Sequence, residues 1–589
     1  MRSTRPPLVT ALLAVLLAAC SAPPEKVEQR GPVWERQFEL PVGFQSLVDE
    51  GLLVVGTARH LYGFEPAGGR RLWRIRNVRA GPADILSLGD VPYILVNDAS
   101  GGSFGDAGTH ILAVGRSDGR MLWESPLLKG KVLQAAVDPL RGILFAVTVP
   151  RPHGDDRGVF SSILPGKGLF SGLKREPQLN ALELSTGRLL WRRPFGRKVA
   201  MRPSYRPRLG EDADWVYTRP FTLGLYHPPL VYEDRVCVTY GGLACYDGRT
   251  GAPLWSQALD VMEGALALSY AAPVLDDDRL YMAADSRIRA FDPDTGKPLW
   301  RSRRLPVVPA LWLDRELVYG QLGGRFFDIK KEEWVWKGRF GAVAVDKASG
   351  KTRWKYDEGH GAVTNLLVAG ERVWLADADR LLALDRRSGR VVVEVEHELQ
   401  APPVYLGLND DRRVLLVGET EAAAFHPVTG KPLWHLRHRP VGPSAWRRFS
   451  AGLMEATGKA LRLGSFVVAN VSGLLPAIPA LSVPLGGARV KLINTKSLVA
   501  DRTGRTSRRL SYQASTLGED ATYAHLRGGY QYFITKPRGH DQALAVVNLR
   551  SGRTERLIVL PSRYPNLVID EVNGRIYQAF GRRLVAVPL

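Results

Sequence analysis

A short phrase recurs along almost the whole chain. Its clearest copy runs from Ala290 to Trp300 and contains a small residue, an acid two positions later, glycine four after that and tryptophan a further four on. Other copies of the phrase, some of them looser, begin at Gly63, Ala113, Ala181, Cys245, Ala344, Ala383, Ala424 and Val546. Because one such unit cannot bury its own apolar face, the series predicts a repeat protein in which each unit packs against its neighbours.

The surroundings of each copy predict about four short β-strands per unit. Before the phrase comes a β-patterned run such as residues 278–284, then a short turn, then a second run that holds the small residue and the acid. No long helical periodicity lies between copies, so the units are expected to be the four-stranded blades of a propeller. The repeat tryptophans should pack between adjacent blades as structural residues: these are Trp73, Trp123, Trp191, Trp255, Trp300, Trp354 and Trp434.

The acid and the glycine of each copy predict a tight turn between the last two strands. A carboxylate can accept hydrogen bonds from backbone amides two and three residues on, and glycine supplies a positive φ without a steric penalty. The repeat acids are therefore interpreted as turn caps rather than metal ligands; they include Asp247, Asp292, Asp346 and Asp385.

The two ends of the chain hold complementary halves of one further copy. Residues 582–589 run through the small-residue strand and stop before any glycine or tryptophan, and the missing half is found at Gly31–Trp34. Pairing of the two terminal strands would complete one blade, close the ring and leave no free sheet edge there. With this split unit, ten copies can be counted.

The phrase Ala-x-Asp-x-x-(Thr/Ser)-Gly-x-x-x-Trp resembles the repeat of pyrroloquinoline-quinone-type β-propellers. The resemblance implies an all-β fold with a single propeller over residues 31–589. Eight blades are expected for such a protein, so two of the ten copies could be decorations or belong to a distorted sheet. Two branches of the superfamily differ in function: the quinoprotein alcohol and glucose dehydrogenases, and the non-enzymatic propeller lipoprotein of the outer-membrane β-barrel assembly machine.

The N-terminus predicts a lipoprotein. Residues 1–19 combine the basic Arg2 and Arg5 with a short apolar run, and residues 17–20 read as a lipobox ending in Cys20. Cys20 would be acylated, with palmitate among the acyl chains, and residues 20–30 would form a tether. Ser21 after the cysteine resembles the signal for outer-membrane sorting. The expected location is the outer membrane, with the body of the protein in the periplasm.

Two insertions interrupt the blade pattern, at about residues 150–177 and 437–509. The second contains residues 464–488, which carry no charge but include three prolines that disfavour a transmembrane helix. A lid over the ring, a membrane-dipping segment and a docking patch for a partner remain alternatives for these insertions. The candidate membrane or partner contacts are Phe160, Leu169, Phe170, Trp446, Phe449, Phe466, Leu474 and Leu475.

Composition adds two expectations. The formal net charge is +21, which in an exported protein favours attraction to anionic lipid, lipopolysaccharide or cell-wall polymers rather than nucleic acid. Besides Cys20, only Cys237 and Cys245 occur, on the two strands of one predicted hairpin. A two-residue turn at 241–242 would set Cys237 opposite Tyr246, so a disulfide would need a bulge or a longer turn, and two buried thiols are the alternative.

The sequence offers no supported catalytic residue or metal site. The resemblance to quinoprotein dehydrogenases implies two adjacent cysteines and a central calcium site, but no Cys-Cys pair exists. The acids at positions 276, 277, 278 and 377 fall in predicted turns, and His360 has no partner at ligand spacing.

Three functions remain open. The leading hypothesis is a protein-binding scaffold without a cofactor that contacts envelope proteins, with a role in outer-membrane protein assembly as one form of it. A dehydrogenase dependent on quinone and calcium is the alternative. A binder of anionic cell-wall or lipopolysaccharide polymers is the third.

Overall fold

The computed structural model describes residues 27–149, 174–259, 271–439 and 530–589, and three short strands at 488–490, 511–512 and 522–525. Short gaps interrupt these ranges at residues 50, 79, 81–84, 88–90, 99–107, 139, 197–198, 201, 208–214, 223–228, 241, 272, 277, 329–332, 362, 401–402, 404, 410, 419 and 561–565. Every regular element in the described part is a β-strand.

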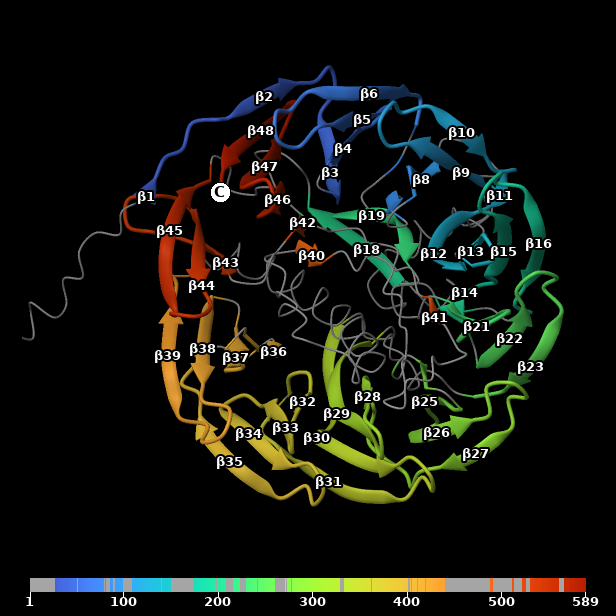
Figure 1. Cartoon of the computed structure of the whole chain (residues 1–589), viewed down its shortest axis with the longest axis vertical. Coiled ribbons are helices and arrows are strands. Elements are labelled where there is room, and N and C mark those ends of the chain that lie inside the picture. Colours follow the sequence, from blue (N-terminus) through green and yellow to red (C-terminus); the bar gives the residue numbers. More distant parts are fainter. Residues whose placement is uncertain are drawn as a thin grey trace, which may run out of the picture.

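Ten sheets of at least four strands stand around a ring, so the predicted all-β single propeller is confirmed (Figure 1). All ten repeat copies form blades, and the expectation of eight blades is wrong. Blades 1 to 5 consist of β3 (Val42–Asp49), β4 (Leu52–Thr57), β5 (His60–Phe64) and β6 (Arg71–Arg76); β7 (Ile85–Ser87), β8 (Tyr93–Asp98), β9 (Gly108–Gly115) and β10 (Met121–Glu124); β12 (Lys131–Asp138), β13 (Ile143–Val149), β15 (Gln178–Glu183) and β16 (Leu189–Pro194); β20 (Leu230–Tyr232), β21 (Arg235–Val238), β22 (Leu243–Asp247) and β23 (Pro253–Gln257); and β24 (Val274–Leu275), β25 (Leu280–Ala284), β26 (Arg287–Phe291) and β27 (Pro298–Arg301).

Blades 6 to 10 complete the circle. They consist of β28 (Leu311–Leu313), β29 (Leu317–Asp328), β30 (Glu333–Asp346) and β31 (Thr352–Gly359); β32 (Leu367–Ala369), β33 (Arg372–Ala376), β34 (Arg380–Asp385) and β35 (Val391–Glu396); β36 (Tyr405–Leu408), β37 (Val414–Val417), β38 (Glu421–Phe425) and β39 (Pro432–Arg437); β43 (Tyr530–Thr535), β44 (Ala543–Asn548), β45 (Arg553–Val559) and β1 (Val27–Glu28); and β46 (Asn566–Asp570), β47 (Arg575–Phe580), β48 (Arg583–Pro588) and β2 (Trp34–Gln37).

Within blades 1 to 8 the strands pair antiparallel in chain order, from the centre of the ring to its rim (Figure 1). The middle strands are buried on both faces, because a neighbouring blade covers each face. The five residues of β25 and the six of β4, for example, are all buried. These strands therefore read as continuous apolar runs, whereas an outer strand such as β31 alternates between buried and exposed positions. The hydrophobic core lies between the blades.

Both ends of the described chain take part in closing the ring. The outer strand of blade 10 is β2, which pairs antiparallel with β48 and sets Trp34 opposite Ala586. In blade 9, β43, β44 and β45 hold the second, third and fourth positions, and the preceding strand of the chain's N-terminal segment, β1, adds in parallel to the outer edge of β45, with Val27 opposite Leu557. The predicted pairing of N- and C-terminal strands is thus confirmed, and the N-terminal segment bridges two blades.

The connections divide unequally between the two faces of the ring. One face, here called the turn face, carries the links from first to second and from third to fourth strands, and all of these are short. The opposite face, here called the long-connection face, carries the links from second to third strands and from blade to blade. The longest intervals between blade strands on this face are those from β13 to β15, from β16 to β20, from β23 to β24 and from β39 to β43.

Parts of these long connections form additional strands. Residues 438–529 contribute β41 (Ser511–Tyr512), which pairs antiparallel with β20, and β42 (Thr522–His525), which pairs in parallel with β46. The strand β40 (Ala488–Val490) then pairs with β42. The remaining strands are β11 (Leu128–Lys129), the pair β14 (Lys174–Arg175) and β17 (Val199–Ala200), and the hairpin β18 (Arg202–Pro207) and β19 (Trp215–Thr222). Figure 1 shows β40, β42 and the β18–β19 hairpin inside the ring.

Candidate binding surfaces

The repeat tryptophans lie at the joints between blades. The indole Nε1 of Trp300 in blade 5 donates a hydrogen bond of 2.7 Å to the main-chain carbonyl of Lys347 in blade 6. That carbonyl belongs to the residue directly after the repeat acid, Asp346. Six other tryptophans donate the same bond to the next blade, in each case to the carbonyl of the residue after the repeat acid or after the residue at that position. The pairs are Trp34 with Pro66, Trp73 with Arg116, Trp123 with Leu184, Trp191 with Gly248, Trp255 with Pro293 and Trp354 with Arg386.

The repeat glycine supports the indole ring from the other side of each joint. At Gly296 an added Cβ would lie 2.4 Å from the ring of Trp255, and φ is +68°. Both the close approach and the left-handed backbone therefore require glycine. The repeat motif thus forms the contact between blades, in which a tryptophan on one blade packs against the glycine turn of the next.

The repeat acids cap the turns that hold these glycines. Oδ1 of Asp292 accepts hydrogen bonds of 2.9 and 2.8 Å from the N–H groups of Asp294 and Thr295, and one of 2.9 Å from the Thr295 hydroxyl. Similar caps form at Asp247, Asp346 and Asp385. The Ser349 hydroxyl, together with Arg353, lowers the pKa of Asp346 to about 2. In each of these four residues, Oδ1 is therefore engaged in the turn.

Two joints depart from the pattern on the tryptophan side. Val393 takes the tryptophan position in blade 7 and packs against Gly430. In blade 8, Trp434 packs against Gly552, but its Nε1 has no hydrogen-bond partner within the described residues. The corresponding carbonyl, that of Leu549, accepts instead from the side-chain amide of Asn409 at 3.2 Å.

The joint between blades 9 and 10 uses arginine in place of tryptophan. Arg556 occupies the tryptophan position of its repeat, and its guanidinium donates to the main-chain oxygen of Leu589. Leu589 holds the position that follows the repeat acid in the other blades. Arg30, in the segment between β1 and β2, donates to the same oxygen at 3.1 Å. The N-terminal segment, blade 9 and blade 10 therefore meet at one main-chain oxygen.

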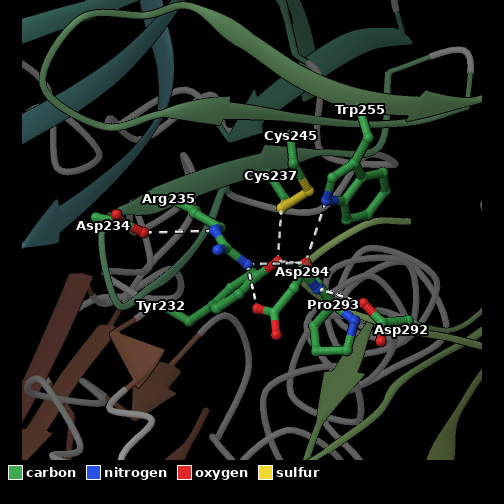
Figure 2. The surroundings of a disulfide bond; sticks show 9 residues. All are labelled: Tyr232, Asp234, Arg235, Cys237, Cys245, Trp255, Asp292, Pro293 and Asp294. Carbon is green, nitrogen blue, oxygen red and sulfur yellow. Dashed lines mark hydrogen bonds and ion pairs between the residues drawn. A yellow bond between two sulfur atoms is a disulfide. The ribbon is translucent and has the colours of Figure 1, made fainter. Parts of the chain in front are cut away.

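A disulfide joins Cys237 and Cys245 across the hairpin of β21 and β22 in blade 4 (Figure 2). The two residues pair directly in the register, with Cα atoms 4.1 Å apart, and Val236 rather than Cys237 lies opposite Tyr246. The two-residue turn expected from the sequence is therefore wrong. The chain makes a longer turn that includes Gly242 at φ +140°, and this shifts the register by one residue.

The surroundings of the disulfide link blade 4 to the turn of blade 5. The hydroxyl of Tyr232 donates to the carbonyl of Pro293 at 2.6 Å, and Trp255 donates to the same carbonyl at 3.1 Å. Arg235 pairs with Asp294 in that turn, and the Sγ of Cys237 lies 3.7 Å from the Tyr232 hydroxyl (Figure 2). The bridge thus fixes the strand pair that carries the joint.

Removal of this bridge is expected to cost about 2.5 kcal/mol of the free energy of unfolding, from the chain entropy of a loop of roughly eight residues. The double variant Cys237→Ala/Cys245→Ala should unfold at lower urea concentration than the parent, and a thiol reductant should shift only the parent. Equal midpoints for oxidised parent, reduced parent and double variant would contradict a stabilising bridge.

A buried histidine at the joint of blades 8 and 9 predicts acid sensitivity. His438 is 5% exposed, its Nε2 lies 3.2 Å from the Thr554 hydroxyl, and its ring packs 5.6 Å from that of Phe533. Burial lowers its pKa from 6.5 to about 4. Between these values the unfolded chain binds a proton and the folded chain does not, so stability is complete above about pH 6.5 and falls towards pH 4.

At pH 5 this single group should reduce the free energy of unfolding by about 2 kcal/mol relative to pH 7.5. Urea unfolding at the two pH values measures the loss. The variant His438→Gln keeps a polar side chain that does not titrate, and it should show a correspondingly smaller difference. The same difference in both proteins would exclude His438 as the cause.

The carboxylates considered for a calcium and quinone site are engaged elsewhere. Asp276 forms an ion pair with Lys347. Asp377 is fully buried and accepts from the N–H of His360 at 3.0 Å and from the guanidinium of Arg380 at 2.8 Å. Asp278 lies 3.5 Å from Arg279.

Asp276 and Asp377 are thus held by neighbouring cations. Position 277 lies outside the described residues, and His360 Nδ1 faces Asp379 at 3.6 Å. In the part of the chain that the structure describes, no three histidine, cysteine or acidic side chains are grouped as metal ligands.

The blade edges are the surfaces that receive extended segments. The outer edge of β45 receives β1, and the inner edges of β20 and β46 receive β41 and β42. Within the described residues, β45 is the one fourth strand that receives an added strand, and nine fourth strands have none on their outer edge: β2, β6, β10, β16, β23, β27, β31, β35 and β39. Several of these expose a large apolar side chain beside the tryptophan position, namely Leu122, Leu254, Leu299, Val392 and Leu433.

The other residues singled out in the sequence lie outside the described residues: Cys20, Phe160, Leu169, Phe170, Trp446, Phe449, Phe466, Leu474 and Leu475. In the described part of the chain, no helix has the length and apolar character needed to cross a membrane.

Comparison with known proteins gives a family match over most of the ring. A family model described as outer membrane protein assembly factor BamB matches residues 111–301, 175–333 and 284–473, which together span more than half of the chain. No curated protein sequence matches this chain.

Among solved structures, BamB from Moraxella catarrhalis is 15% identical with a TM-score of 0.33, and the match covers 67% of this chain and 96% of that one. A quinohemoprotein alcohol dehydrogenase from Comamonas testosteroni is 11% identical with a TM-score of 0.29, covering 70% of this chain and 71% of that one. At these identities and TM-scores, the structural matches do not distinguish an assembly factor from a dehydrogenase.

Proposed function

Because this chain belongs to the pyrroloquinoline-quinone-type repeat family described as outer membrane protein assembly factor BamB, we propose that it is a binding scaffold of the cell envelope. It acts without a cofactor, and its partners are envelope proteins with extended segments, among them outer-membrane proteins during assembly. The repeat residues serve the joints of the ring, so binding falls to the edges of the blades and to the long-connection face.

The observation that carries this proposal is strand addition within the chain itself. Three blades receive an extended segment on a free edge, once on an outer strand and twice on inner strands. Such pairing takes its affinity from main-chain hydrogen bonds and its selectivity from side chains on alternate positions. The nine outer edges without an added strand offer the same chemistry to a strand of another protein.

The lipobox-like sequence at the N-terminus supports a proposal for the position of the scaffold in the cell. We propose that Cys20 is the lipid-bearing residue of the mature protein, that residues 20–30 are the tether, and that the ring stands in the periplasm at the outer membrane. The described part of the tether begins at β1, on the rim of blade 9. This blade would then be the part of the ring nearest the membrane.

Peptide binding tests the scaffold directly. A fluorescent peptide with the alternating sequence of an outer-membrane barrel strand should bind the purified chain. The same peptide with alternate backbone nitrogens methylated should bind at least about tenfold more weakly, since it loses several main-chain hydrogen bonds of about 1 kcal/mol each. Equal binding of the two peptides would exclude strand addition.

A second measurement separates the scaffold from the dehydrogenase. The chain is incubated with pyrroloquinoline quinone and Ca²⁺, passed through a gel-filtration column, and assayed for quinone absorbance and dye-linked alcohol oxidation. The proposal predicts no retained quinone and no turnover. Retained quinone with turnover would establish an enzyme.

A further inference from the structure

An open hollow of about 590 Å³ lies between blades 8 and 9, on the long-connection face. It is lined by Arg439, which follows β39, and by residues 536–541, which connect β43 to β44. The hollow therefore adjoins the start of the connection 438–529. No function assigned above uses it.

Main-chain bonds fix the shape of this hollow. The carbonyl of Arg439 accepts the N–H of Lys536 at 3.1 Å and the hydroxyl of Thr535 at 3.0 Å. The N–H of His540 donates to the carbonyl of Pro537 at 3.3 Å, and Gly539 turns the chain at φ +81°. The backbone is held in place, and the charged side chains are exposed to solvent.

The lining carries more basic than acidic side chains. Arg439, Lys536 and Arg538 are cationic and His540 can become so, whereas Asp541 is the one acid among the lining residues. Within the described residues, none of these basic side chains forms an ion pair or a hydrogen bond. Several basic side chains elsewhere on the ring do form ion pairs, for example Arg583 with Glu35 at 2.6 Å and Arg380 with Asp377 at 2.8 Å. Unpaired cations around one hollow favour a ligand with several anionic oxygen atoms.

The size of the hollow favours a phosphate carried on an organic group. Ligand sites commonly have volumes of about 300–1,000 Å³, which is much more than a single inorganic ion needs. The position of the hollow on the ring indicates where such a phosphate would come from. Blade 9 also carries β1, and the seven residue-to-residue steps from Cys20 to Val27 span at most about 25 Å. A lipid anchor at Cys20 would therefore bring this blade close to a membrane surface.

We infer that the hollow formed by Arg439, Lys536, Arg538 and His540 binds the phosphate of a membrane lipid headgroup. Binding of phosphate follows from the charges and the volume, and the choice of a lipid rests on the anchor proposed above. Such a contact would fix the orientation of the ring on the membrane, with the long-connection face turned towards the lipid. Attachment of the chain at one residue alone does not set that orientation.

Vesicle binding by a chain that cannot be acylated tests this inference. The full chain with Cys20→Ser is mixed with phosphatidylcholine vesicles that contain or lack phosphatidic acid. The variant Lys536→Gln/Arg538→Gln should bind the phosphatidic acid vesicles about tenfold more weakly than the parent, because it loses two charged contacts to the phosphate.

A matched control removes the same charge from the turn face. The variant Lys297→Gln/Lys431→Gln changes two exposed lysines in the turns of blades 5 and 8 and lowers the net charge equally. It should retain vesicle binding within about twofold. Equal loss in the two variants would reduce the effect to non-specific attraction and overturn the site.

Titration of the protein with glycerol phosphate identifies the ligand. Binding is monitored by calorimetry or by shifts of the protein's amide NMR resonances. Weak saturable binding that the Lys536→Gln/Arg538→Gln variant loses, together with its loss of vesicle binding, supports the lipid headgroup. Loss of glycerol phosphate binding with unchanged vesicle binding would assign the hollow to a soluble phosphorylated ligand and overturn the lipid. If the peptide experiment above failed, the vesicle and glycerol phosphate results could still be interpreted as lipid binding or as binding of a soluble phosphorylated ligand.

Discussion

Replacement of Trp354 by alanine is expected to lower the free energy of unfolding by about 3–5 kcal/mol. The side chain is 6% exposed, its Nε1 donates to the carbonyl of Arg386 at 2.9 Å, and its ring lies against Gly389, where an added Cβ would come within 2.6 Å. Alanine would leave a cavity between blades 6 and 7 and an unsatisfied carbonyl. Urea unfolding followed by circular dichroism measures the cost.

Phenylalanine at the same position separates packing from hydrogen bonding. Trp354→Phe keeps most of the buried apolar area and loses the bond to Arg386, so its cost should be nearer 1–2 kcal/mol. A cost for Trp354→Ala below about 1 kcal/mol would show that the joints do not hold the blades together. Equal costs for both variants would assign the joint to the hydrogen bond alone.

Replacement of Trp34 by alanine is expected to have a similar cost, about 3–5 kcal/mol, and in addition to open the ring. Trp34 is 7% exposed, donates to the carbonyl of Pro66 at 3.1 Å and packs 5.7 Å from the ring of Tyr577. It joins blade 10 to blade 1 through the N-terminal strand β2, which no covalent loop connects to β48. Loss of this side chain should release β2 and expose the edge of β48.

Limited proteolysis distinguishes opening from a uniform loss of stability. In the Trp34→Ala variant, cleavage within residues 27–41 should become faster while the rest of the ring resists under native conditions. The Trp354→Ala variant is the control, since its damaged joint lies within the continuous chain. Equal cleavage of residues 27–41 in the parent and in Trp34→Ala would contradict closure by this strand.

The sequence was sufficient to predict the ring, its joints and its closure, because one short phrase contains every part of the joint. The tryptophan, the turn acid and the glycine occur at fixed spacing, and each has a local physical role. The split copy at Gly31–Trp34 and residues 582–589 predicted the closure for the same reason. The blade number followed from counting copies, and the usual number of eight was a poor guide.

The features that could not be predicted depend on contacts between distant segments. Arg556 aligns with the tryptophans, but nothing in its local sequence indicates that it reaches Leu589. The register of Cys237 and Cys245 depends on the length of one turn, which the Gly-Gly pair suggested to be shorter than it is. Pairing of β1 with β45 and of β41 with β20 joins residues hundreds of positions apart, and short strands have no specific pairing code. The basic hollow arises only where Arg439 meets residues 536–541.

The scaffold function is tested most directly in cells by photo-crosslinking from the blade edges. A photoreactive residue is placed singly at the exposed outer-strand positions Leu122, Leu254, Leu299, Val392 and Leu433, and at the turn-face positions Arg249, Lys297 and Arg387 as controls. The account predicts crosslinks to envelope proteins, including outer-membrane proteins in assembly, from a contiguous group of outer-strand positions and not from the controls. Crosslinks confined to the turn face, or none from any edge, would contradict a scaffold that binds its partners by strand addition.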